Sequence, residues 1–137
     1  MKPTNAARLF AIVTALAVLF QAGLVAGMPW GAFAWGGSYP GTLPPPMRAA
    51  SAGSAFLLVV LIGIVLVRAG LVRPDWQPRS RKAAWLVVVF CGASVVANSI
   101  TPSARERAVW LPVTLLMFGT SMVVARSQAP PRSKGMS

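Results

Sequence analysis

The sequence contains no histidine, one cysteine (Cys91) and only two acidic side chains, Asp75 and Glu106. The lack of histidine excludes imidazole acid–base catalysis, Ser–His and Cys–His nucleophile pairs, and the usual zinc sites. A single cysteine excludes an intramolecular disulfide. The two carboxylates lie in opposite parts of the chain. We therefore expect no enzymatic activity, no cofactor and no metal.

Charge in general is scarce. Only 11% of the residues are charged, whereas a soluble domain averages about 25%. Hydrophobic residues make up 55% of the chain, and the mean hydropathy is +0.65. The net charge of +11 does not favour a nucleic-acid partner, because the basic residues form short clusters at the ends of apolar runs. This composition indicates a membrane protein.

Four stretches carry no formal charge: residues 9–27, 49–67, 83–100 and 108–125. Each is close to the roughly 20 residues that an α-helix needs to cross the hydrocarbon core. The sequence therefore predicts an all-α fold, a bundle of four transmembrane helices that forms a single integral membrane domain over residues 1–137.

The basic residues predict how the bundle is oriented. Ten lie before the first span, in the loop 68–82 or after the fourth span, and three lie on the other side. The positive-inside rule then places both termini in the cytoplasm. An alternative interpretation of the first span is a signal peptide, because a basic start precedes an apolar core that ends in small residues. Cleavage would leave three spans in the same orientation.

Four polar residues are expected near the outer mouth of the bundle. Gln21 and Asn98 lie toward the outer ends of their spans, where an amide needs a hydrogen-bond partner. They are expected to bond to each other across the bundle or to face a ligand. Arg48 and Glu106 lie at the same depth and are expected to form an ion pair. A competing role for Glu106 is a capping box with Ser103 at the start of the fourth span.

The loop 28–48 is rich in Gly, Pro and aromatic residues and has no charge before Arg48. Its Gly and Pro content prevents a long helix, and its aromatic rings favour the membrane interface over water. Two interpretations follow: a connector that lies on the interface, or a lid over a small apolar cavity. The candidate lid residues are Trp30, Phe33, Trp35 and Tyr39.

Two segments carry a resemblance to a known family. "MPWGAFAWGG" with the following "LPPPMRAAS", and "TPSARERAVWLPV" near the C-terminus, resemble a family of small four-helix bacterial integral membrane proteins. The resemblance covers nearly the whole chain. It implies a topology and supplies no catalytic residues.

Two functions are compatible with these features. The first is a structural or accessory membrane protein of the bacterial inner membrane that acts through helix and lipid contacts, with a second copy or a larger membrane complex as partner. The alternative is a carrier or binder of a small neutral or lipidic molecule beneath the outer loop. In either case membrane lipids are partners. The candidate contacts to anionic lipid are Arg73, Arg79, Arg81 and Lys82.

Overall fold

A computed structural model of the protein describes residues 1–128. Within these residues the fold is all-α, as predicted, and four helices are long and apolar enough to cross a membrane. They are α1 (Pro3–Ala26), α2 (Pro45–Arg68), α3 (Arg81–Ile100) and α4 (Ala104–Arg126). Three short 3₁₀ helices lie in the connections: η1 (Gly31–Phe33), η2 (Trp35–Gly37) and η3 (Pro74–Ser80). The chain is a small, multi-pass, four-helix membrane protein.

Local chemistry determines where the helices begin and end. Proline occupies the first turn of α1 and of α2, where its missing N–H is not needed. Gly27 ends α1 in the left-handed conformation, with φ of 97°. Ser103 caps α4, because its Oγ accepts a hydrogen bond from the Glu106 N–H at 3.1 Å. This is one half of the predicted capping box.

The helices extend past the uncharged stretches by several residues. α2 includes Arg48, and α4 begins before Arg105, Glu106 and Arg107. Helical backbone continues here because long cationic side chains can reach from a helix end toward the interface.

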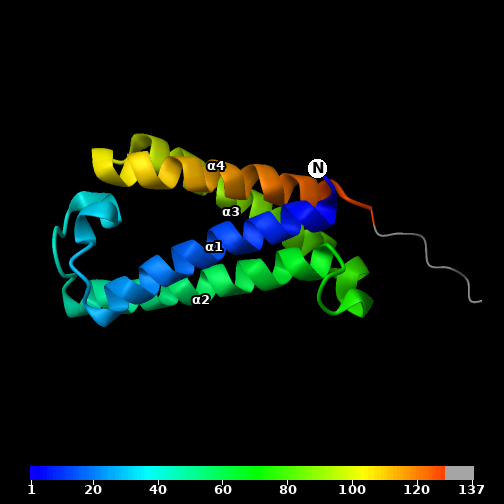
Figure 1. Cartoon of the computed structure of the whole chain (residues 1–137), viewed down its shortest axis with the longest axis horizontal. Coiled ribbons are helices and arrows are strands. Elements are labelled where there is room, and N and C mark those ends of the chain that lie inside the picture. Colours follow the sequence, from blue (N-terminus) through cyan, green and yellow to red (C-terminus); the bar gives the residue numbers. More distant parts are fainter. Residues whose placement is uncertain (129–137) are drawn as a thin grey trace, which may run out of the picture.

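The four helices form two antiparallel hairpins (Figure 1). α1 packs along α2 and α3 along α4, and α1 also contacts α4. The N-terminus, the loop that contains η3 and the end of α4 lie at one end, which we call the basic end. The loop 27–44 and the turn between α3 and α4 lie at the other, which we call the aromatic end. The hairpins lie close together at the basic end and diverge toward the aromatic end (Figure 1).

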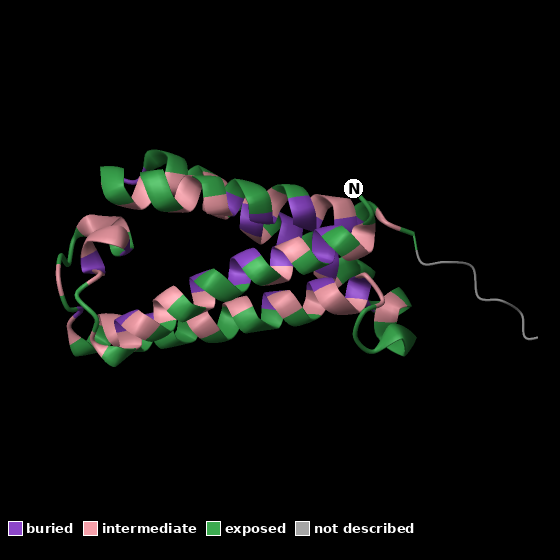
Figure 2. Ribbon diagram, in the orientation of Figure 1, coloured by how far each residue is buried: buried purple, intermediate pink, exposed green. Residues whose placement is uncertain are grey.

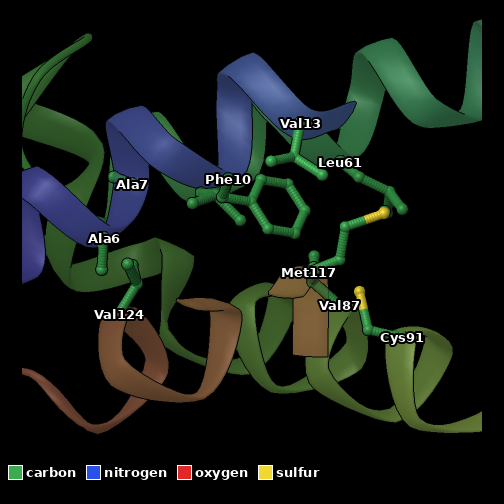
Figure 3. Packing of buried hydrophobic residues seen from close by; sticks show 10 residues of the cluster. Ala6, Ala7, Phe10, Val13, Leu61, Val87, Cys91, Met117 and Val124 are labelled. Carbon is green, nitrogen blue, oxygen red and sulfur yellow. The ribbon is translucent and has the colours of Figure 1, made fainter. Parts of the chain in front are cut away.

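The main hydrophobic core lies in the half of the bundle nearer the basic end. Its members come from all four helices: Ala6, Ala7, Phe10, Val13, Leu61, Val65, Val87, Cys91, Met117 and Val124. Figure 3 shows the Phe10 ring projecting from α1 into this cluster. Cys91 is a fully buried packing residue here. Buried residues are accordingly concentrated toward the basic end (Figure 2).

Candidate ligand pocket beneath the aromatic loop

Between the diverging hairpins lies a pocket of about 390 Å³. All four helices and the loop 27–44 contribute to its wall. The lining residues are Ala17, Phe20 and Gln21 of α1; Phe33, Ala34 and Trp35 of the loop; Ser54, Leu57 and Leu58 of α2; Phe90, Ser94 and Asn98 of α3; and Glu106, Trp110, Val113, Thr114 and Met117 of α4. Most of these side chains are apolar, and a few polar groups converge among them. This is the usual composition of a small-molecule site.

Hydrogen bonds tie the loop to both hairpins across the mouth of the pocket. Trp35 Nε1 donates to Ser51 Oγ of α2 at 3.2 Å. On the opposite side, Trp110 Nε1 of α4 donates to the Phe33 carbonyl at 2.8 Å, and Ser103 Oγ donates to the Ala32 carbonyl at 2.9 Å. The loop therefore bridges the two hairpins where their helices no longer touch closely.

Aromatic packing holds the loop against α1. The Phe20 ring stacks on Trp30 at 5.9 Å between centroids and meets Trp110 edge-on at 4.7 Å. Gly23 makes this possible, since a Cβ built there would lie 2.2 Å from the Trp30 ring. Leu24 of α1 forms a small buried cluster with Ala34 and Leu43 of the loop.

The loop itself is closed by backbone contacts that require glycine. The Gly31 N–H donates to the Gly41 carbonyl at 2.8 Å. A Cβ at Gly31 would lie 1.8 Å from the Tyr39 carbonyl oxygen. Trp35 has a φ of 53°, a left-handed conformation that is unfavourable for a side chain of this size. Its hydrogen bond to Ser51 helps to hold it there.

The predicted outer-mouth cluster is only partly brought together. Gln21, Asn98 and Glu106 line the same pocket. The expected bond between the two amides is not formed. Asn98 Nδ2 donates to the Ser94 carbonyl of its own helix at 2.8 Å. Gln21 Oε1 is buried, and none of residues 1–128 donates a hydrogen bond to it.

The predicted ion pair between Arg48 and Glu106 was wrong. The Arg48 guanidinium donates through Nε and Nη2 to the Val25 carbonyl, at 2.9 and 2.6 Å. Glu106 instead accepts a hydrogen bond from Thr101 Oγ1 at 2.9 Å. Val25 lies in the last turn of α1, where a carbonyl has no partner within the helix and carries the negative end of the helix dipole. The backbone carbonyl of Val25, and not the carboxylate of Glu106, therefore anchors Arg48.

The four candidate lid residues occupy three kinds of position. Phe33 and Trp35 line the pocket. Trp30 packs on Phe20 beside it. Tyr39 is exposed at the surface of the loop.

The candidate lipid contacts also separate. Arg73 and Arg79 line an apolar groove beside Val60, Ile64 and Val67 of α2. Arg81 lines a separate pocket at the basic end, together with Arg68 and Arg126, and Lys82 is exposed.

Sequence reasoning missed Phe20 and Trp110 as wall residues and gave Ser54, Ser94 and Thr114 no site. For Ser94 a usable signal was its helical spacing from Asn98. Ser94 and Asn98 lie four residues apart, as do Trp110 and Thr114, so each pair shares a helix face.

Fold and pocket together define a class: a small four-helix membrane protein with a ligand-sized pocket beneath an aromatic loop. No protein-family model matches the chain, and no curated protein or solved structure is significantly similar to it. The resemblance to a bacterial family therefore stays a prediction.

Proposed function

We propose that this protein binds a small neutral or lipidic molecule in the pocket beneath its aromatic loop. The observation that carries the proposal is the pocket itself, because a loop that served only as a connector would need no hollow beneath it. Its volume of about 390 Å³ lies within the range of about 300–1,000 Å³ that is usual for ligand sites. The binding would take place within the membrane, between the two hairpins.

The chemistry of the wall narrows the ligand. Its surface is mainly hydrocarbon and aromatic, which suits an acyl chain or another apolar body. Gln21 Oε1 is a buried acceptor without a donor among residues 1–128, and an unmet buried acceptor costs about 1–3 kcal/mol. Glu106 adds acceptor oxygens to the wall. A ligand with a hydroxyl or amide N–H donor would satisfy these groups.

We also propose that the wall serves binding and not catalysis. Glu106 is the sole titratable side chain among the lining residues, so it has no second acid or base there. The hydroxyls of Ser94 and Thr114 donate to carbonyls of their own helices and not to Glu106.

A quenching experiment tests the pocket. The full chain in detergent is titrated with a brominated long-chain alcohol. Of the five tryptophans, Trp35 and Trp110 line the pocket, so the saturable part of the quenching reports the arrival of bromine there. We expect saturable quenching by the alcohol. A brominated alkane of the same length lacks the donor and should bind about three- to tenfold more weakly, the equivalent of one hydrogen bond.

The matched control uses two alanines of α1. Ala17→Leu fills the pocket, whereas Ala15→Leu adds the same atoms on an exposed position two residues away. Quenching should be lost in the first variant and retained in the second. Equal, non-saturating quenching in the wild type and both variants would mean that the probe only dissolves in the micelle, and the proposal would fail.

The orientation is part of the proposal. We propose that the basic end faces the cytoplasm of a bacterium and that the protein resides in the inner membrane. The ten-to-three distribution of basic residues and the resemblance to the bacterial family support this orientation and location. Reporters that are active only in the cytoplasm should be active after residue 137 and inactive within the loop 28–47. The opposite pattern would overturn the orientation without affecting the pocket.

A second candidate function, as an accessory protein that acts through helix contacts, is favoured by the outer face of α2. Cβ atoms built at Gly53 and Gly63 would meet no atom within 4 Å. Glycines that are not used for packing within the chain leave room for close approach by another helix. Cross-linking of a cysteine placed at position 53 to a second chain would support this role, and labelling of that cysteine by lipid-soluble reagents alone would argue against it.

A further inference from the structure

A second pocket lies at the basic end, with a volume of about 440 Å³. It is formed where the end of α2, the start of α3 and the end of α4 meet. Three arginines, Arg68, Arg81 and Arg126, line it together with Trp85 and Ser127. Three cations that line one pocket attract an anion.

Arg68 is the innermost of the three. Its side chain is buried, with 5% of its surface exposed. It donates through Nη1 to the Gln77 carbonyl at 3.2 Å and through Nη2 to the Ser127 carbonyl. Its Nε is buried and has no acceptor within residues 1–128. Neutral carbonyls position the guanidinium, but they do not neutralise its charge.

The sequence offers no acidic side chain for this purpose. Of its two carboxylates, Asp75 lies 3.7 Å from Arg73 in an exposed pair, and Glu106 lies at the aromatic end. Arg81 and Arg126 add two more positive charges beside Arg68. A buried cation normally has a counter-charge, because taking it out of water without one is costly.

We propose that this pocket binds a phosphate group, supplied by the headgroup of an anionic phospholipid. Guanidinium groups match phosphate oxygens in geometry and charge. The pocket lies where membrane-capable helices end, and Trp85 belongs to the residue type that is enriched at the interface. This inference concerns the opposite end of the bundle from the ligand pocket and does not depend on the proposed function.

Native mass spectrometry of the full chain, released from membranes that contain phosphatidylglycerol and phosphatidylcholine, tests the proposal. Arg68 is not substituted, because its hydrogen bonds to the Gln77 and Ser127 carbonyls also connect α2 to the η3 loop and to the end of α4. The pocket variant combines Arg81→Gln with Arg126→Gln. The matched control combines Arg73→Gln with Arg79→Gln, which removes the same charge at the same end but outside the pocket.

We expect the amount of phosphatidylglycerol that the pocket variant retains to fall at least about tenfold, because charge-assisted hydrogen bonds are lost. The control should retain it nearly as the wild type does. Equal loss in both variants would show that the basic end attracts lipid only by diffuse charge, and no loss in either would show that another anion neutralises Arg68. Either result overturns the proposal.

A competition arm distinguishes the source of the phosphate. Millimolar glycerol phosphate, which is soluble, is added before release. Retention of phosphatidylglycerol should not change if the lipid tail contributes to binding. Displacement of the lipid, with glycerol phosphate bound in its place, would assign the pocket to a soluble phosphate compound and overturn the lipid assignment.

Discussion

The basic half and the aromatic half of the bundle are built on the same four helices but are held together differently. In the basic half, side chains from every helix interlock in one buried cluster. In the aromatic half, the hairpins border a pocket, and hydrogen bonds that each hairpin forms with the loop connect them. Close packing leaves little room for a bound molecule. A pocket that is bridged by a loop leaves such room, but its walls make fewer packing contacts. The basic half therefore supplies most of the buried packing, and the aromatic half contains the open space.

The largest expected effect contrasts two phenylalanines of α1. Phe10→Ala removes a fully buried ring from the packed half and should lower the free energy of unfolding by about 3 kcal/mol. This is the low end of the usual range, because lipid replaces water around the unfolded helices. Phe20→Ala removes a ring from the pocket wall and should cost only about 1 kcal/mol, the worth of its aromatic contacts. Unfolding in mixed micelles compares the two, and equal losses would contradict the division into halves.

Next in size is the loop closure at Gly31. Gly31→Ala would place a Cβ against the Tyr39 carbonyl and should cost about 1–3 kcal/mol by overpacking. Because the damage is local, the loop should become sensitive to protease while the basic half stays folded. Gly53→Ala, where a Cβ meets no atom within 4 Å, serves as the matched control and should change neither property. Protease resistance in both variants would show that the loop does not depend on this contact.

A smaller effect is expected at the α4 cap. Ser103→Ala removes the acceptor for the Glu106 N–H and the donor to the Ala32 carbonyl. We expect a loss of about 1 kcal/mol and a weaker tie between loop and hairpin. Ser99→Ala, at an exposed position bonded within its own helix, should be close to neutral. Thermal unfolding of both variants in detergent measures the difference, and a neutral Ser103→Ala would contradict the bridging role.

The smallest effect is the coupling free energy between Arg48 and Glu106, which should be close to zero. Arg48→Gln should destabilise the protein, since it removes the guanidinium that donates to the Val25 carbonyl. Glu106→Gln should destabilise it less, since a neutral amide oxygen is a weaker acceptor for Thr101 Oγ1 than a carboxylate. Their effects should add within about 0.3–0.5 kcal/mol, because the two side chains share no contact. A double-mutant cycle by thermal unfolding measures the coupling. A larger value would restore the ion pair and tie the loop to α4 by charge.

The four helices could be predicted from the sequence, because a long uncharged stretch between cations can cross a membrane in few conformations other than an α-helix. The sequence also placed Gln21, Asn98 and Glu106 at one end, where the structure brings them to one wall. It was not sufficient for the divergence of the hairpins. Membrane helices are apolar on every side, so the hydrophobic pattern does not indicate which face meets a neighbour and which meets lipid.

The error at Arg48 has a similar origin. A count of charged side chains made Glu106 the expected partner of Arg48. Such a count does not include the free backbone carbonyls at the end of α1. Their availability depends on where Gly27 ends the helix. The tertiary position of Val25 then decides the contact.

The ties of the loop have a consequence for the order in which the molecule is assembled. The bond from Trp35 to Ser51 joins residues 16 apart and can form as soon as the first hairpin has entered the membrane. The bonds to Ser103 and Trp110 join residues 71 and 77 apart, so they must await the second hairpin. A chain stopped after α3 should therefore leave the loop open to protease, and the same protection as in the full chain would contradict this order. The part of the pocket wall that α4 contributes is therefore added last of the four helices, and a chain that stops before α4 presents its aromatic loop without that wall.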